Sequence, residues 1–97
     1  MPVTLCVLLW ANPGHEDLLT DYESQVLALV PRHGGRVVSR VRNVATDDGR
    51  PAEVQVIEMP DDEAVAAYTA DPERTARLDL RDRAIARTEI IRVQHVG

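Results

Sequence analysis

Hydrophobic residues alternate with polar ones, or run together, in four short segments, which is the pattern of β-strands. The first segment, residues 3–10, is apolar on both faces and therefore predicts a strand that is covered on both sides. A polar loop at residues 43–51 contains an Asp-Gly turn, so the segments on either side of it are expected to pair antiparallel. The four predicted strands cover residues 3–10, 36–42, 53–59 and 88–96.

Between these strands, the hydrophobic positions recur at helical spacing. Residues 14–30 carry apolar side chains three and four positions apart, and Pro31 with the glycine pair after it is expected to end that helix. Asp61 is placed to cap a second, short helix. An Asp-Pro pair opens a further helical run over residues 71–85, because proline is tolerated in the first turn of a helix.

The resulting order is strand, helix, strand, strand, helix, strand, within one domain that spans residues 1–97. This order is typical of the ferredoxin-like α+β fold, in which two helices cover one face of a four-stranded antiparallel sheet. The strand at residues 3–10 is apolar on both faces, and the helices can cover only one of them. We therefore expect the other face to pack against a second copy of the chain in a homodimer.

The amino-acid composition excludes several classes of function. The net charge is −5, so the phosphate backbone of a nucleic acid would repel the chain, and no nucleic-acid partner is expected. All 11 basic residues are arginines, which excludes Schiff-base catalysis by a lysine and a Walker-type phosphate lysine. No apolar run is long enough for a membrane span and no signal peptide is recognisable, so a cytoplasmic protein without a membrane partner is expected.

Three short motifs resemble a known family. They are RHGGR at residues 32–36, VIEMP at residues 56–60 and DPE at residues 71–73. These motifs look like those of an uncharacterised small family of dimeric α+β barrels, which is distantly similar to the antibiotic-biosynthesis monooxygenases. The resemblance implies a homodimer whose two sheets face each other around a ligand cleft. It also implies a small-molecule binder or an enzyme, since the relatives include cofactor-free oxygenases, haem-degrading enzymes and isomerases.

The chain departs from the usual pattern of that family at three positions. Met59 stands where the family has an aromatic residue, Asp61 where it has a serine, and Arg74 where it has a tyrosine. Fold analogy does not select a reaction, so the chemistry has to be argued from side chains.

Glu58 is the first candidate catalytic residue. It shares a strand face with two valines, and a carboxylate on an apolar face would have its pKa raised, as suits a general acid or base. The alternative is a structural ion pair with an arginine. His95 is expected near Glu58 or Thr4, because the first strand runs opposite to the third and fourth, and it could complete an acid–base pair.

The candidate substrate-binding residues come from two strands. Arg40 and Arg42 are predicted to share a face and could clamp a carboxylate or phenolate, or else they protect an edge strand from pairing. Trp10 and Asn12, at the end of the first strand, have the residue types that line the cleft in monooxygenase-like relatives, although plain core packing of Trp10 is the favoured alternative. Cys6 lies mid-strand, and an inert buried thiol is the alternative to a reactive one.

No metal site and no cofactor are expected, because His15, His33 and His95 are scattered without metal-ligand spacing. Two hypotheses of function follow. The first is a cofactor-independent enzyme, of oxygenase, isomerase or cyclase type, that acts on a small apolar or aromatic metabolite. The second is a non-catalytic ligand-binding or structural homodimer. A cavity of roughly 300 Å³ or more with an unpaired Glu58 would favour the enzyme.

Overall fold

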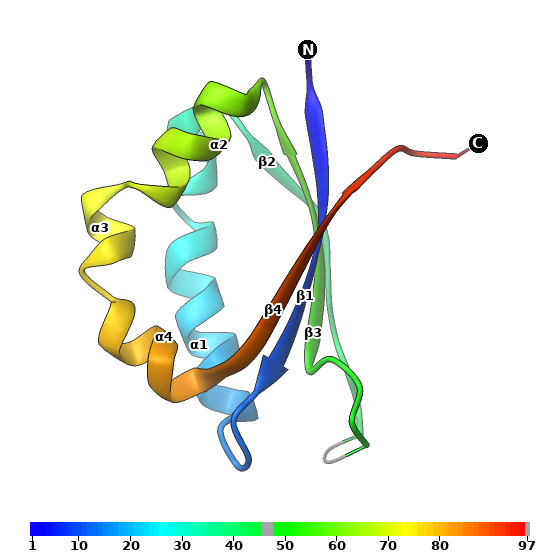
Figure 1. Cartoon of the computed structure of the whole chain (residues 1–97), viewed down its shortest axis with the longest axis vertical. Helices are drawn as coiled ribbons and strands as arrows, with labels where there is room; N and C mark the ends of the chain where they lie inside the picture. The colour runs from blue at the N-terminus through cyan, green and yellow to red at the C-terminus, as the bar shows by residue number, and fades with distance from the viewer. Residues whose placement is uncertain (46–47, 97) are drawn as a thin grey trace.

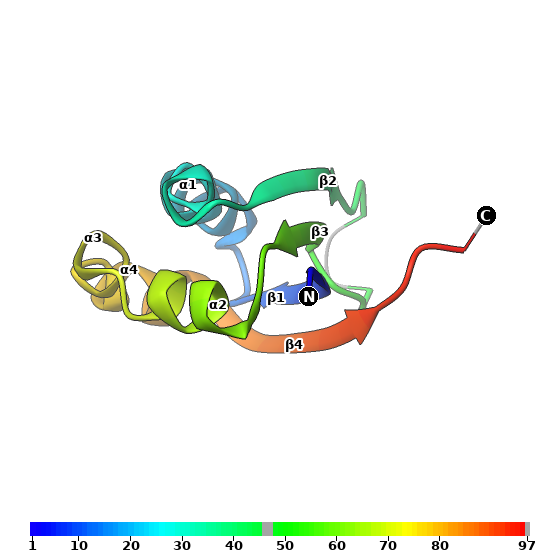
Figure 2. The same ribbon diagram turned by 90° about the horizontal axis from the view of Figure 1, so that it is seen from above.

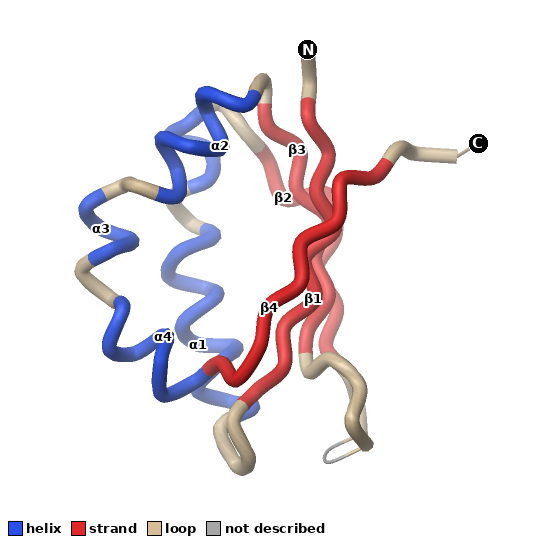
Figure 3. The backbone as a smooth tube through the Cα atoms, in the orientation of Figure 1, coloured by secondary structure: helices blue, strands red, loops and turns tan. Residues whose placement is uncertain are grey.

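The computed structural model describes residues 1–45 and 48–96, which form a four-stranded antiparallel sheet with helices on one face (Figure 1, Figure 3). The strands lie in the order β2-β3-β1-β4, so the first and third strands of the sequence are central. This is the ferredoxin-like fold that the sequence predicts. In chain order the elements are β1 (Val3–Ala11), α1 (Glu16–Leu27), the 3₁₀ helix η1 (Val30–His33), β2 (Arg36–Arg42), β3 (Glu53–Met59), α2 (Asp62–Thr69), α3 (Pro72–Thr75), α4 (Leu78–Ala84) and β4 (Ile85–Val93).

Each strand places alternate residues on the two faces of the sheet. In β3 the residues at 53, 55, 57 and 59 are buried beneath the helices, whereas those at 54, 56 and 58 are half-exposed on the opposite face. Figure 2 shows that no helix covers this second face, which we call the open face. Within the described residues the open face therefore has no helical cover.

The core lies between α1 and the sheet. Leu19, Tyr22 and Val26 of α1 are fully buried, or nearly so. They pack against Val7, Leu9, Ile57 and Met59 of the two central strands. The apolar positions of α1 and of the two central strands therefore form a single hydrophobic layer, which holds the helix against the sheet.

Local signals set most of the element boundaries. The Asp61 side chain accepts a hydrogen bond from the backbone N–H of Ala64 (2.8 Å) and caps α2 as predicted. Asp71 caps α3 in the same way. Gly34 has a φ of +79°, the left-handed conformation that ends η1 and that glycine adopts without strain.

Three predicted boundaries are wrong. The first helix covers Glu16–Leu27 and is followed by the separate η1, rather than filling residues 14–30. The helical run at residues 71–85 is divided into α3 and α4, and Ile85 begins β4. The last strand is therefore Ile85–Val93 instead of 88–96, because Ile85 pairs with Ala11 across an irregularity in β1.

Strict alternation along β2 predicts that its three arginines share one face, and this prediction is wrong because the strand contains a bulge. Val37 pairs with Ile57 but Ser39 pairs with Val56, so one extra residue of β2 is accommodated between them. The strand changes face at this point. Arg36 consequently lies on the open face, while Arg40 and Arg42 lie on the side of the helices.

Candidate functional site

A cavity of about 120 Å³ lies between the helices and the covered face of the sheet. Its walls are mostly apolar side chains of β1, β3 and β4, including Leu5, Val7, Ile57 and Met59. The polar residues that reach it come from the helices and the strands beneath them. They are Glu23, Gln55, Tyr68, Thr69, Arg74, Arg81 and Thr88. An apolar cavity with a few converging polar groups is the usual form of a small-molecule site.

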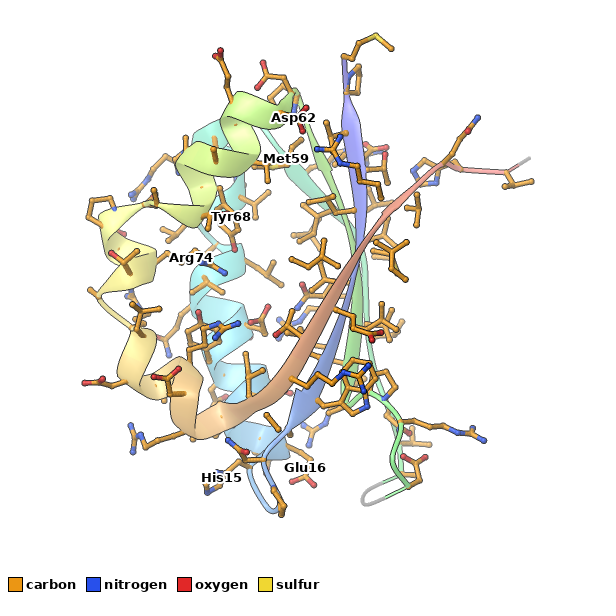
Figure 4. All side chains as sticks on the ribbon, viewed as in Figure 1. His15, Glu16, Met59, Asp62, Tyr68 and Arg74 are labelled. Atoms are coloured by element: carbon orange, nitrogen blue, oxygen red, sulfur yellow. The ribbon has the colours of Figure 1, made fainter. Side chains whose placement is uncertain are left out.

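Arg74 extends from α3 toward the sheet (Figure 4). Its position follows from the Asp71 cap and from Pro72, which begin a helix three residues earlier. The guanidinium lies over the ring of Tyr68, with 5.2 Å between Cζ and the ring centroid. Its Nη1 has one long contact, 3.4 Å, to the carbonyl oxygen of Thr69. Its Nε is buried and has no hydrogen-bond partner among the described residues.

Tyr68 is held as a neutral phenol. Its hydroxyl donates a hydrogen bond to the carbonyl oxygen of Val26 (3.1 Å), which ties α2 to the end of α1. Burial raises the pKa of Tyr68 to about 12, so this group does not ionise at neutral pH. Tyr68 therefore serves as an aromatic wall of the cavity and as a support for Arg74.

Glu23 brings a buried carboxyl group to the cavity. Burial is the main cause that raises the pKa of Glu23, and the hydrogen bond from Gln55 opposes this effect. Nε2 of Gln55 donates to Oε1 of Glu23 (2.7 Å) and also to Oε2 of Glu53 (2.6 Å). A carboxyl group with a raised pKa beside an apolar cavity holds its proton more readily than an exposed one, which suits a general acid or base.

Tyr22 adds a second buried polar group near Glu23. Its side chain is fully buried, and its hydroxyl has no hydrogen-bond partner within residues 1–45 and 48–96. Burial raises the pKa of Tyr22, while the positive charge of Arg74 opposes the shift. The hydroxyl of Tyr22 and Nε of Arg74 thus both lack a hydrogen-bond partner among the described residues, and the charge of Arg74 is close enough to act on Tyr22.

Glu58 does not have the environment that the sequence predicts. Oε1 accepts a hydrogen bond from Nε of Arg36 (2.8 Å), its neighbour across β2 and β3. This bond is the largest cause that lowers the pKa of Glu58, so the expectation of a raised pKa is wrong. The predicted proximity of His95 is confirmed, because its Nε2 lies 3.1 Å from Oε2 of Glu58. The alternative interpretation, an ion pair with an arginine, therefore describes Glu58.

Arg40 and Arg42 contact carboxylates of their own chain. Arg40 donates two hydrogen bonds to Glu53, at 2.9 and 3.0 Å, and two more to Ser24 and Thr20 of α1. Arg42 pairs with Asp17 at 2.7 Å. Neither arginine lines the cavity, since the bulge in β2 turns both of them toward α1.

The remaining predicted residues lie outside the cavity. Nε1 of Trp10 donates to the carbonyl oxygen of Gly49 (3.1 Å), and Trp10 lines a separate hollow of about 250 Å³ beside residues 43–45 and 48–52. Nδ2 of Asn12 donates to the carbonyl oxygen of Arg83 (2.8 Å) near the end of α4, a structural contact. Cys6 of β1 carries a half-buried free thiol and pairs with Val56 of β3, on the open face.

Glu23, Tyr68 and Arg74 are not among the residues that the sequence pattern singles out as candidates. Glu23 falls on an amphipathic helix among other acids, and nothing in its spacing separates it from a solvent-exposed residue. A signal existed for Arg74, since it is one of the positions at which the chain departs from the pattern of the resembling family. Met59, another of those positions, also lines the cavity.

Among the described residues, no group of three or more His, Cys, Asp or Glu side chains is placed to hold a metal ion. In the same part of the chain, none of the helices combines the length and the hydrophobicity that a membrane crossing requires.

Solved structures with the same architecture come from several bacteria. A protein of unknown function from Rhodopseudomonas palustris superposes with a TM-score of 0.78 at 18% sequence identity, over 99% of this chain and 83% of that one. A dimeric protein of unknown function and ferredoxin-like fold from Bacteroides fragilis matches with a TM-score of 0.71 at 14% identity, over 97% and 96% of the two chains. A candidate antibiotic biosynthesis monooxygenase from Bacteroides thetaiotaomicron matches with a TM-score of 0.71 at 16% identity, over 99% and 90%.

These identities are low, so the structural matches establish the fold and do not transfer a reaction. No curated protein is similar enough in sequence to count as a relative. The family model of a domain of unknown function, DUF1330, matches residues 12–96, which is most of the chain. Structural neighbours of this chain include a dimeric ferredoxin-like protein and a candidate antibiotic biosynthesis monooxygenase. The resemblance found in the sequence is thereby confirmed, and the chain belongs to the DUF1330 family.

Proposed function

We propose that this protein is a homodimer that binds one small, largely apolar molecule per chain in the cavity between the helices and the sheet. The observation that carries this proposal is the cavity itself, with apolar walls and a buried guanidinium Nε that has no partner in the described chain. An engineered apolar cavity of about 150 Å³ holds benzene, so 120 Å³ suits a group of roughly five to seven non-hydrogen atoms. The volume is well below roughly 300 Å³, so the proposed ligand is small.

The open face supports the dimer. Val41, Ile91 and Val93 are exposed there by 57%, 49% and 37%, next to half-buried residues of the central strands. Three exposed β-branched residues on one face form the kind of apolar patch that another protein surface covers. Solved neighbours of the same fold are dimeric, from Bacteroides fragilis among others. A second copy of the chain, related by a two-fold axis, would cover the patch with the same patch.

Proton transfer is the chemistry that the cavity could add to binding. Glu23 replaces Glu58 as the candidate acid or base, because its pKa is raised by burial whereas that of Glu58 is lowered. It would take a proton from a bound molecule or return one to it, as isomerisation or cyclisation requires. The alternative to proton transfer at this site is binding without catalysis. It is favoured by the hydrogen bond that Gln55 donates to Glu23, which occupies one oxygen of the carboxyl group.

A cavity-filling variant tests the binding site. Val65 lines the cavity from α2, and Ala66 is an exposed residue of the same helix. We expect fragments of about six non-hydrogen atoms, detected by ligand-observed NMR, to bind the natural protein and Ala66→Phe but not Val65→Phe. The proposal is overturned if no fragment binds, or if the fragments bind Val65→Phe unchanged. The mass in solution, from light scattering, tests the dimer, and Ile91→Arg is expected to produce monomers.

A further inference from the structure

We propose that the ligand of this cavity is a short monocarboxylate, with its carboxylate on Arg74 and its hydrocarbon tail against the sheet. This assignment rests on the proposed function and names the class of molecule that the cavity takes. Nothing in the family description or in the related structures assigns a ligand to it.

Guanidinium groups that have no carboxylate partner among the described residues indicate the charge of the ligand. Two arginines, Arg74 and Arg81, line the cavity. In the described part of the chain, no carboxylate oxygen lies within 4.0 Å of either one. Arg81 has one long contact, 3.4 Å, to Oγ1 of Thr88. A guanidinium that lines an apolar cavity without a carboxylate partner favours an anionic ligand, whose carboxylate would form charge-assisted hydrogen bonds with it.

Arg40 provides an internal comparison. It also lies between the helices and the sheet, and it has a bidentate carboxylate partner, Glu53, together with two oxygens of α1. The chain therefore supplies acceptors to a guanidinium in this layer when the role of that guanidinium is structural. Arg74 has no such carboxylate partner among the described residues, and its Nε has no hydrogen-bond acceptor there.

The acidic group at the cavity does not cancel this positive charge. Glu23 makes no ion pair with Arg74 or Arg81 among the described residues, and its carboxylate oxygen accepts from the neutral amide of Gln55. Burial favours the protonated form of Glu23, because it raises the pKa of this group. A protonated Glu23, which lines the cavity, would be an additional donor to an anion rather than a competitor for Arg74.

The cavity walls and volume select a monocarboxylate over a phosphate or a dicarboxylate. Leu5, Val7, Ile57 and Met59 form an apolar floor that would leave a second charged group without partners. A volume of 120 Å³ holds roughly six non-hydrogen atoms, by comparison with benzene in about 150 Å³. The carboxylate accounts for three of these atoms, which leaves a tail of about three carbons in the size range of butanoate.

A homologous series of probes tests the class of ligand. Acetate, propanoate, butanoate, pentanoate and hexanoate would be titrated against the natural protein and followed by amide chemical shifts in NMR spectra. We expect the affinity to rise about fourfold for each methylene that is buried and to level off near butanoate or pentanoate. Butan-1-ol, a neutral molecule of similar size, should bind at least tenfold more weakly than butanoate.

Two charge-removing variants separate this inference from the proposed function. Arg74→Gln should weaken butanoate by at least tenfold and leave butan-1-ol nearly unchanged, which also shows that the variant is folded. Arg83→Gln removes the same charge from an exposed position of α4 and should change neither. If butan-1-ol binds as tightly as butanoate, or if Arg74→Gln retains the preference for the carboxylate, the monocarboxylate assignment is overturned while the binding site stands. If neither probe binds and fragment binding also fails, both proposals are overturned.

Discussion

Replacement of Arg40 by methionine is the clearest test of how the polar layer beneath α1 holds the fold. Arg40 spans three elements, since it bonds to Glu53 of β3 and to Ser24 and Thr20 of α1. Methionine retains most of the length of the side chain but removes every donor. The substitution therefore isolates the loss of hydrogen bonds and charge from the loss of packing.

The expected loss of stability follows from the buried carboxylate of Glu53, which loses its ion-pair partner. The side chain of Glu53 is 2% exposed, and without Arg40 its remaining side-chain partner among the described residues is the amide of Gln55. That amide also serves Glu23, so two buried carboxyl groups would depend on one NH₂ group. Removal of one partner from a buried ion pair costs about 3 to 5 kcal/mol. The Arg40 side chain is 27% exposed, so we expect the lower end, about 3 kcal/mol.

Urea denaturation at a fixed protein concentration would measure this change, with Arg42→Met as the matched control. Arg42 lies on the same strand and the same face, but its pair with Asp17 is 44% and 90% exposed and should contribute less than about 1 kcal/mol. In thermal unfolding, Arg40→Met should lower the midpoint by at least about 12 °C, since 1 kcal/mol shifts a domain of this size by about 4 to 8 °C.

A double variant checks the cause. Replacement of both Arg40 and Glu53 by methionine should recover at least half of the lost stability, because a buried pair replaced by apolar groups is nearly neutral. The reasoning is refuted if Arg40→Met destabilises no more than Arg42→Met, or if the double variant is less stable than Arg40→Met alone.

Three further predictions concern other parts of the chain. Glu23→Gln should gain stability relative to the natural protein as the pH rises. The folded-state pKa of Glu23 is raised, so the stability that its protonated form contributes is intact below the ordinary pKa of about 4.3. This stability is lost as the pH rises through the folded-state pKa. Unfolding free energies of both proteins, measured from below about pH 4.3 upward, check this prediction, and a stability difference that does not change with pH would contradict it. Gly35→Ala should destabilise by about 3 kcal/mol, because a Cβ there would lie 2.7 Å from the backbone oxygen of Glu58; Gly14→Ala, with a φ of +79° and open space around it, should lose only about 1 kcal/mol. Equal losses in urea melts would refute the packing argument. Asp61→Ala should lose about 1 kcal/mol with its helix cap, more than the exposed Glu63→Ala in the same turn, and equal chemical-denaturation midpoints for the two would count against the cap.

The sequence was sufficient for the fold because each element carries its own local signal. In β3 the alternation of residues 53–59 matches the alternation of burial along that strand. The Asp61 cap follows from an aspartate placed before a helical run, and its hydrogen bond involves residues only three positions apart. The open face was predicted from the two-sided apolar strand at residues 3–10, because helices can cover only one side of a sheet.

The candidate site was not predicted to the same extent, and Arg40 shows why. Strict alternation along β2 places Arg36 and Arg40 on one face, whereas the bulge between Val37 and Ser39 separates them. A bulge depends on the pairing with β3, which no property of β2 alone reveals. The same limit applies to Glu58, whose pKa is set by Arg36 from the neighbouring strand.

The order of strands and helices, the caps and the apolar open face were therefore determined by the sequence itself, because periodicity and capping act over a few neighbouring residues. The tertiary structure decided which polar groups meet. Glu23 of α1, Arg74 of α3 and Ile57 of β3 are far apart in the chain, and they line one cavity only because the helices pack across the sheet. The same packing buries Glu23, which raises its pKa, and buries Nε of Arg74, which has no hydrogen-bond partner among the described residues.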